Sequence, residues 1–478
     1  MCQKASEGGR RCTPGITAAQ RRNMVRRLNR LNPDSQAHTE LSERIENLDK
    51  AREEYGACVT PLDIPVPEGV HSILDTINSK GYTPLLVGGT VRDAMIGGTT
   101  PKDFDIEVYG ANIDTLAKSL RSAGYRVDEV GKSFGVLKVT TKDSARDDID
   151  ISVPRRDSLV GAGHRGFEVE MDAEMSVEEA SQRRDFTFNA LMWDYRYQAV
   201  IDPHNGTHDL QAGVLRHVSD AFAEDPLRSL RGFQFASRFN MTMDPETSKF
   251  CQNLYPQAKD MAVERIATEW QKFYHKAKHP SQGMKALRDM GWSGHAPGLE
   301  KVNTKELGAK LDRALEVSQR DNLNDQKKTT LLAATIMRGM DDTEAEGFAR
   351  ATLIGKENQR LPLHLRSANV QKNMSDYEVK RLAQHLSKKE LNIADWARYE
   401  DLSGDKNLAQ DVLGKAHTLH VADHQEEPYL QGRNLLPMTS RKPGKWVSHL
   451  LAEAEEKQYR GEFANAQEAL AWAKAKLG

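Results

Sequence analysis

The pattern of apolar and polar positions changes near residue 216 of this 478-residue chain. Before it, short apolar runs alternate with segments of helical period, which is typical of a mixed α/β domain. The predicted strands span 83–87, 104–110, 134–141 and 148–154, and the predicted helices span 70–81 and 113–124. Glycines end both helices, since Gly81 and Gly124 follow the last apolar positions.

After residue 216 the strand pattern stops and amphipathic helical segments follow one another. They cover 225–239, 261–277, 327–339, 376–389 and 446–461. The C-terminal half is therefore predicted to be all-α, in several subdomains.

Composition sets wide bounds. The chain is 38% hydrophobic and 28% charged, with a net charge of −2, which suits a multi-domain protein with much exposed helix. A nearly neutral total does not exclude nucleic acid, because local patches decide binding. No apolar run approaches the roughly 20 residues of a membrane span, and the N-terminus lacks the apolar core of a secretion signal. The cysteines are scattered, which favours a reducing cytoplasm; they are Cys2, Cys12, Cys58 and Cys251.

Residues 1–60 are polar and locally basic. Helical spacing clusters five arginines on part of one predicted helix, namely Arg21, Arg22, Arg26, Arg27 and Arg30. Two interpretations stay open: a solvated helix or partly disordered arm, or an arm that contacts RNA.

A Gly88-Gly89 pair follows the apolar strand 83–87 and precedes a helix. This arrangement frees backbone N–H groups for an anionic phosphate; the alternative is a plain strand–helix turn. Arg92, in the first turn of the helix, can grip a triphosphate with its fork. Its neighbour Asp93 is expected to cap or brace.

Asp103 and Asp105 flank Phe104 at the next strand. Residues i and i+2 of a strand share a face, and two carboxylates side by side repel unless a cation joins them. Oxygen ligands select Mg²⁺, or Mn²⁺ in its place. Asp148 and Asp150 repeat the spacing on a later strand, so Asp150 is a candidate third carboxylate and Asp148 its competitor.

Two later segments mix charge with apolar residues. Arg183 to Asn189 carries Phe186 and Phe188, whose burial would leave the neighbouring charges in need of partners. The second segment, Glu224 to Arg231, opens a helix: Asp225 precedes Pro226, as a cap would, and lies three residues before Arg228. That pair either presents an acceptor and a fork donor to a base edge or forms an ion pair within the helix.

Seven segments taken in order resemble one family. They are VGGTVRDAMIGG…KDFDIEVYG, VGKSFGVLKV, IDISVPRRDS, GHRGFEVEMD, RRDFTFNALMWD, VIDPHNGTHDL and LRHVSDAFAEDPLRSLRGFQFASRF, all between about residues 70 and 245. They are similar to class II tRNA nucleotidyltransferases, the CCA-adding enzymes, which are related to bacterial poly(A) polymerase within the polymerase-beta-like superfamily. Residues 431–477 are similar to the tail of many bacterial members.

The resemblance implies an α+β fold: a polymerase-beta-like nucleotidyltransferase head with a mixed sheet and helices, then an all-α neck, body and tail. It implies these divisions: a basic extension (1–60), a catalytic head (61–215), a neck that selects the nucleotide (216–300), a body (301–425) and an RNA-binding tail (426–478). In the family pattern Asp103 and Asp105 are the catalytic metal pair, with Asp150 added here. The implied nucleotide contacts are Gly88, Gly89, Arg92, Arg184, Asp185, Asn189, Glu224, Asp225, Arg228 and Arg231.

The expected reaction is template-independent addition of C, C and A from CTP and ATP to the 3′ end of tRNA. A poly(A) polymerase, or an enzyme that adds only CC or only A, shares these motifs, and a catalytically inactive RNA-binding homologue is the remaining alternative. Gln234 stands where bacterial members often carry another arginine, which puts one triphosphate contact in doubt. Arg338-Gly339 stands where an HD-type domain has His-Asp, so no HD metal site is expected. His417, His420 and His424 are expected to be surface residues rather than metal ligands.

Overall fold

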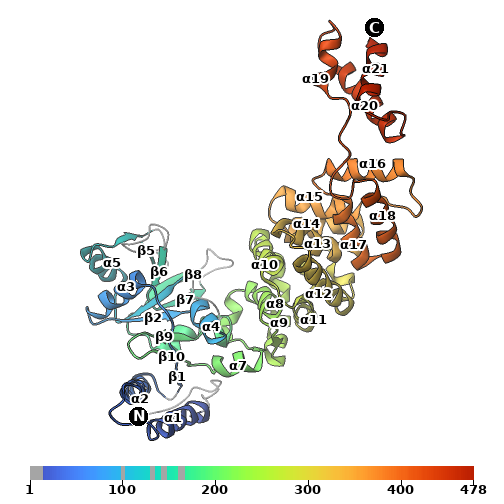
Figure 1. The fold of residues 1–478 in the computed structure, drawn as a ribbon. Coiled ribbons are helices and arrows are strands. Elements are labelled where there is room, and N and C mark those ends of the chain that lie inside the picture. The colour runs from blue at the N-terminus through green and yellow to red at the C-terminus, as the bar shows by residue number, and fades with distance from the viewer. Residues whose placement is uncertain are drawn as a thin grey trace. The chain divides into compact units, whose positions relative to one another are not determined.

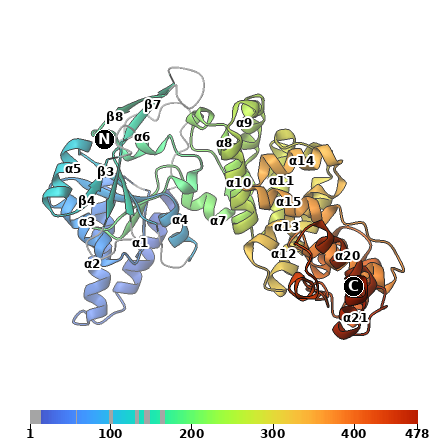
Figure 2. The same cartoon turned by 90° about the horizontal axis from the view of Figure 1, so that it is seen from above.

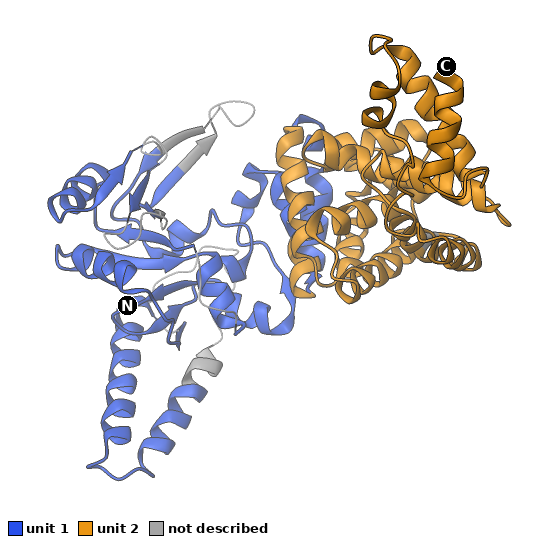
Figure 3. Cartoon of the chain, turned by 45° about the horizontal axis from the view of Figure 1, so that its top comes forward, with its two compact units in different colours: residues 1–232, 241–260 blue, residues 233–240, 261–478 orange. Residues whose placement is uncertain are grey.

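The computed structural model describes residues 14–56, 58–97, 103–129, 135–140, 148–159 and 167–477. The chain forms two compact units (Figure 3). Unit 1 comprises residues 1–232 and 241–260, and unit 2 comprises residues 233–240 and 261–478.

Within the described part of unit 1, eight strands form one mixed sheet in the order β1-β10-β9-β2-β3-β6-β5-β4 (Figure 1). Every neighbouring pair is antiparallel except β3 and β6, which run parallel. The strands are β1 (Val59–Pro61), β2 (Thr83–Val87), β3 (Asp105–Tyr109), β4 (Arg126–Asp128), β5 (Val136–Thr140), β6 (Asp148–Ser152), β9 (Met192–Asp194) and β10 (Ala199–Ile201). The predicted strands at 83–87, 104–110 and 148–154 are confirmed, as is the described part of 134–141.

The two faces of the sheet differ because strand side chains alternate. Ile106 and Val108 of β3 join a large apolar cluster with α3 (Glu68–Asn78) and α5 (Ile113–Ser122), which lie together in Figure 2. The intervening Asp105, Glu107 and Tyr109 therefore point to the opposite face, where Tyr109 joins a smaller cluster with Leu85 and Val87. This second face carries the polar chemistry.

Short elements cover the second face and its edge. Phe186 and Phe188 are fully buried, so the segment that carries them is partly buried, as its sequence predicted, and it ends in η2 (Thr187–Asn189). Helix α7 (Gly206–Ala212) packs so tightly on it that a Cβ at Gly206 would lie 2.1 Å from the carbonyl oxygen of Thr187. The remaining elements of unit 1 are α1 (Pro14–Leu28), α2 (Gln36–Tyr55), α4 (Gly89–Met95), β7 (Arg155–Leu159), β8 (Phe167–Met171), α6 (Val177–Ser181), β11 (Val214–Leu215), η3 (Asp220–Glu224), β12 (Thr242–Met243), α9 (Pro245–Leu254) and η4 (Tyr255–Asp260).

Helix α8 (Leu227–Phe239) is shared between the units, and the described part of unit 2 is otherwise helical. Its elements are α10 (Val263–Lys276), α11 (Pro280–Asp289), η5 (Ser293–His295), η6 (Leu299–Lys301), α12 (Thr304–Arg320), α13 (Asp325–Ile336), η7 (Met337–Gly339), α14 (Asp342–Thr352), α15 (Lys356–Arg366), α16 (Asp376–Ser387), α17 (Ile393–Ser403), α18 (Lys406–Thr418), α19 (Gly432–Leu435), η8 (Leu436–Met438), α20 (Lys445–Tyr459) and α21 (Ala466–Leu477). The last three helices share an apolar core of their own.

These observations confirm the predicted fold class, a mixed-sheet α+β head followed by helices. The expectation that no strand follows residue 216 was wrong in one short piece, β12, which pairs in parallel with β11. Cys58 is disulfide-bonded, which the scattered spacing of the cysteines did not predict. None of the described helices combines the length and apolar character that crossing a bilayer requires.

Candidate active site

The polar face of the sheet brings three carboxylates together. Asp105 opens β3 and lies directly beside Asp150 in the parallel register of β3 and β6. Both later candidates have partners on β5, but only Asp150 is also paired with a residue of β3 in the register of the two strands, and that residue is Asp105. Asp103 precedes β3 by two residues, and its backbone carbonyl accepts a hydrogen bond of 2.6 Å from the Thr90 hydroxyl. Thr90, which the sequence did not single out, thus ties α4 to the loop that carries Asp103.

The electrostatics of Asp105 report this crowding. Burial raises the pKa of Asp105, and the charges of Asp150 and Asp103 raise it further, against the opposing charge of Arg184. Asp150 Oδ1 is enclosed yet accepts no hydrogen bond from the described residues, and its nearest recorded cation is Lys138 Nζ at 3.7 Å.

This donor set fits a hard divalent cation. It consists of carboxylate oxygens, one of them without a hydrogen bond, and mutual repulsion among them would be relieved by positive charge. Among the described residues no three His, Cys, Asp or Glu side chains are already arranged around a metal position. The three carboxylates are therefore candidate ligands that do not yet form a closed ligand set.

The Gly88 turn lies against the carboxylates. Gly88 has φ +73°, a conformation that favours glycine, and a Cβ there would lie 3.7 Å from Asp105 Oδ2 and 3.9 Å from Arg184 Nη1. A Cβ at Gly89 would lie 3.4 Å from Arg92 Nη2. The turn predicted to cradle phosphate therefore lies between an acidic and a basic side chain.

A buried polar chain links this turn to α8. Arg92 Nη1 donates to Asn189 Oδ1 at 2.7 Å, and Asn189 Nδ2 donates to Asp185 Oδ1 at 3.0 Å. Arg231 Nε then donates to Asp185 Oδ2 at 2.6 Å. Burial alone would raise the pKa of Asp185, but the Arg231 charge and these hydrogen bonds hold it below its usual value. Asp185 is thus an ionised, buried hub, and Asp93 braces Arg92 through a 2.8 Å hydrogen bond.

Glu107 is a second buried hub, and the sequence did not single it out. Its side chain is fully buried and accepts hydrogen bonds of 3.0 Å from Arg183 Nη2 and from the Tyr109 hydroxyl. Arg184 Nη2 lies 3.8 Å from Glu107 Oε2. Burial and the Glu107 charge raise the pKa of Tyr109. Tyr109 therefore stays protonated, and its hydroxyl donates a hydrogen bond to Glu107. Glu107 therefore holds both arginines of the 183–189 segment at the polar face.

The start of α8 contributes the remaining candidates. Asp225 Oδ1 accepts from the Leu227 amide at 3.2 Å, as a cap does. Arg228 donates to the carbonyl oxygens of Ala221 at 2.6 Å and Arg183 at 2.7 Å. Burial lowers the pKa of Arg228, while the charges of Asp185 and Asp225 oppose that change. Glu224, at the end of η3, is half-buried beside them.

Other predicted positions lie elsewhere. Gln234 is buried and belongs to unit 2. Arg338 forms a two-point ion pair with Glu400, at 2.7 and 3.1 Å. The three histidines at 417, 420 and 424 are exposed.

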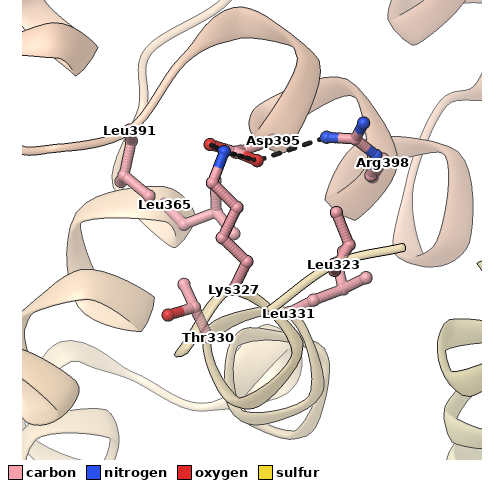
Figure 4. A pocket seen from close by; sticks show the side chains of 8 residues that line it. All are labelled: Leu323, Lys327, Thr330, Leu331, Leu365, Leu391, Asp395 and Arg398. Atoms are coloured by element: carbon pink, nitrogen blue, oxygen red, sulfur yellow. Dashed lines mark hydrogen bonds and ion pairs between the residues drawn. The ribbon is translucent and has the colours of Figure 1, made fainter. Parts of the chain in front are cut away.

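Two hollows in unit 2 differ in kind. Figure 4 shows a cavity of about 10 Å³, where Lys327 and Arg398 both pair with Asp395 among leucines. It has room for about one water molecule and is far below the size of a nucleotide pocket. The second is a groove of about 420 Å³ on the tail, lined by basic side chains and Trp446 together with Glu453 and two leucines.

Three family models match separate parts of the chain. Residues 85–216 match the poly A polymerase head domain, residues 240–301 match the probable RNA and SrmB-binding site of polymerase A, and residues 324–473 match a putative tRNA nucleotidyltransferase domain 2. The matched domains are those of poly(A) polymerases and tRNA nucleotidyltransferases, which are the proteins that the motifs resemble.

Two curated relatives are multifunctional CCA proteins. The one from Nitrosococcus oceani is 36% identical over 209 residues, 43% of this chain and 48% of the relative. The one from Nitrosospira multiformis is 36% identical over 210 residues, 43% of this chain and 47% of the relative. The chain spans about half the length of the curated relatives it matches.

The fold is similar to solved CCA-adding enzymes. The Bacillus stearothermophilus enzyme in complex with CTP aligns with a TM-score of 0.61 at 20% identity, covering 86% of this chain and 98% of that one. The Thermotoga maritima enzyme complexed with tRNA aligns with a TM-score of 0.59 at 16% identity, covering 90% and 98%.

Proposed function

We propose that this chain adds C, C and A to the 3′ end of tRNA, taking CTP and ATP, releasing pyrophosphate and using no nucleic-acid template. The observation that carries the proposal is the convergence of Asp105 and Arg184 at the Gly88 turn, with Asp150 beside Asp105. The CCA-adding activity is that of the relatives by name, and CTP and tRNA are the molecules bound in the similar structures.

We also propose Mg²⁺, or Mn²⁺, as the metal, held by Asp103 and Asp105 with Asp150 as third carboxylate. When bound, such an ion lowers the pKa of the tRNA 3′-hydroxyl and offsets charge on the triphosphate. The raised pKa of Asp105 and the unbonded Oδ1 of Asp150 support this assignment.

The side chains around the carboxylates hold the nucleotide. The amides of Gly88 and Gly89 face the phosphates, and Arg184, beside that turn, binds them with its guanidinium. Arg92 orients the same turn, while Asp185 and Asn189 keep Arg92 and Arg231 in place toward ribose and phosphate. Because this chain of hydrogen bonds is buried, its geometry is set before the nucleotide arrives.

Selection of the base falls to the start of α8. Asp225 offers acceptor oxygens. Arg228 offers the N–H groups of its guanidinium that do not bind the carbonyl oxygens of Ala221 and Arg183, and Glu224 is adjacent. A base with the wrong edge leaves these half-buried groups unpaired, which is costly.

The helical unit supplies surfaces for tRNA. The tail groove combines basic side chains with an aromatic ring, as surfaces that bind nucleic acid do: Arg441, Lys445, Trp446, His449 and Lys476 line it, beside Glu453, which pairs with Lys476 at 3.0 Å. We assign the tail to RNA binding on that basis, and we place the enzyme in the cytoplasm, where its proposed substrate is matured.

The test is incorporation on defined tRNA transcripts. Transcripts that end before CCA, after C, after CC and after CCA are incubated with CTP, ATP or both, and products are resolved at single-nucleotide length. The proposal expects addition that stops at CCA. Unlimited A-tailing would instead establish poly(A) polymerase activity, which the match to the poly A polymerase head favours as second candidate. Addition of only CC or only A would narrow the activity.

Asp103→Ala is the control for the metal assignment. It should abolish incorporation and leave tRNA binding intact. Unchanged incorporation would refute the assignment, and a wild-type chain that binds tRNA without any incorporation would mark an inactive homologue.

A further inference from the structure

Helices α1 and α2 form a hairpin within unit 1, visible in Figure 3 as two long helices that run side by side. The hairpin is fixed to the edge of the sheet. Met24 packs on a small core of Leu48, Ala51, Val59 and Ala199. Tyr55 donates to Asp194 at 2.9 Å, and Arg196 donates to Glu54 at 2.8 Å. The hairpin is thus part of the body that carries the candidate active site.

One helix of the hairpin has positive charge without any negative charge. Residues 14–33 contain five arginines and no Asp, Glu or Lys. Arg21 forms a two-point ion pair with Asp49 of α2, at 2.5 and 2.6 Å. The other four are exposed and form no ion pair with the described residues: Arg22, Arg26, Arg27 and Arg30.

Ion pairs inside the described hairpin do not account for these four arginines. The acids of α2 that form ion pairs have other partners: Glu46 pairs with Lys50, Asp49 with Arg21 and Arg52, and Glu54 with Arg196. Arg22 and Arg26 are four residues apart in α1, so they lie roughly 6 Å apart along its axis, and Arg30 follows in the turn after the helix ends at Leu28. Like charges at this spacing destabilise a helix. A row of unpaired guanidiniums is therefore kept at a cost that an anionic partner would offset.

The chemistry of the row favours a phosphate backbone. Guanidinium forks bind phosphate oxygens at two points. A membrane helix needs an exposed apolar face beside its charges, and a protein interface needs an apolar core. None of the exposed large apolar side chains of the described chain lies in this hairpin. The family matches begin at residue 85, so the hairpin precedes the matched domains.

We propose that the arginine cluster made of Arg22, Arg26 and Arg27 of α1 and Arg30 of the turn that follows it binds the phosphate backbone of the RNA substrate and enlarges its contact with the catalytic head. The proposal rests on the proposed function for the identity of the substrate. Binding of this kind carries no sequence information and depends strongly on salt.

The test uses the full-length chain with Arg22, Arg26, Arg27 and Arg30 all changed to Gln, a good helix former that keeps polarity. Binding to a tRNA transcript is measured across a series of KCl concentrations. If all four arginines meet phosphates, the slope of log Kd against log salt becomes shallower by about 3, and Kd at moderate salt rises roughly tenfold or more. The KM for tRNA rises while the KM for CTP is unchanged.

Two controls separate this cluster from general charge. The same four positions changed to Lys keep the charge and should restore most of the salt slope. A dispersed variant loses four exposed charges from other elements of unit 1 and should keep the wild-type slope; it carries Lys80→Gln, Lys118→Gln, Arg126→Gln and Lys259→Gln. Circular dichroism of all variants verifies that the helices remain.

The proposal is overturned if the Arg-to-Gln variant keeps the wild-type salt slope and Kd for tRNA. It is also overturned if this variant keeps its tRNA binding but loses binding to anionic lipid vesicles, because the arginines would then bind lipid headgroups. Failure of the proposed function is distinct: the wild-type chain would then add no nucleotide to tRNA. Normal incorporation with an unchanged salt slope refutes only the role of the hairpin.

Discussion

Replacing Glu107 by Gln tests whether the buried hub on β3 positions the arginines of the site. The variant keeps the size of the side chain and one carbonyl acceptor. It removes the negative charge that faces Arg183 at 3.0 Å and Arg184 at 3.8 Å, and it puts an amide donor beside two guanidiniums. We expect both arginines to shift, with Arg184 losing its position beside the Gly88 turn.

The size of the effect follows from burial. Glu107 is fully buried and the Arg183 side chain is 21% exposed. A surface ion pair contributes about 0 to 1 kcal/mol to stability, whereas a hydrogen bond to a charged group contributes about 1.5 to 3 kcal/mol. The Glu107–Arg183 pair is closer to the second case. We expect the free energy of unfolding to fall by about 2 kcal/mol. A similar loss in the phosphate grip of Arg184 would lower kcat/KM for CTP about 30-fold.

The assay measures kcat and KM for CTP separately, together with urea unfolding. Glu54→Gln is the matched control, because it breaks another Arg–Glu pair of the same unit, at 2.8 Å, in which the glutamate side chain is 36% exposed. The control should cost less than about 1 kcal/mol and leave kcat/KM unchanged. Equal kcat/KM in the two variants would refute the positioning role, even if Glu107→Gln were the less stable.

Three further predictions concern stability and tRNA binding. Gly206→Ala should lower the free energy of unfolding by about 3 kcal/mol or more and weaken CTP binding, because its Cβ would meet the backbone of Thr187. The control Gly414→Ala lies in open space within α18 and should be neutral or stabilise by up to about 1 kcal/mol. Similar unfolding midpoints for the two variants would contradict the tight packing at Gly206. Burial lowers the pKa of His295 to about 4, from 6.5, so the unfolded chain binds the proton first and stability is lost as pH falls below 6.5. Between pH 7 and pH 5 this loss is about 2 kcal/mol, and His295→Gln should remove it in urea titrations at both pH values. Trp446→Ala should weaken the binding free energy for tRNA by about 1 kcal/mol or more, seen as a higher Kd, without changing the KM for CTP. An unaltered Kd would show that the groove does not bind tRNA.

Local pattern was enough to predict much of the head. The strand at 104–110 alternates strictly around an apolar face, and the helices at 113–124 and 376–389 repeat their apolar positions at helical period, so each was predicted within a few residues. By contrast β1, β9 and β10 have three residues each, too few to display a period. They were missed because pairing with neighbours, rather than their own pattern, makes them strands.

The candidate site divides in the same way. Asp103 and Asp105 stand out because their spacing is local, whereas Asp148 and Asp150 look alike until the register with β3 separates them. Glu107 occupies a polar position of an alternating strand, which usually means a solvent-facing side chain. Its partner Arg183 lies 76 residues away, so only the tertiary fold shows that it is buried.

Glu107 and Asp105 are both close to Arg184 on the polar face of the sheet. Among the described residues the recorded ion pair of Arg184 is with Glu107, although Arg184 also lies near Asp105 beside the Gly88 turn. Burial and the neighbouring carboxylates outweigh the opposing charge of Arg184, so the pKa of Asp105 is raised. Under the proposed function, an Arg184 held 3.8 Å from Glu107 would leave the carboxylate oxygens to a metal ion and would itself be available to the triphosphate.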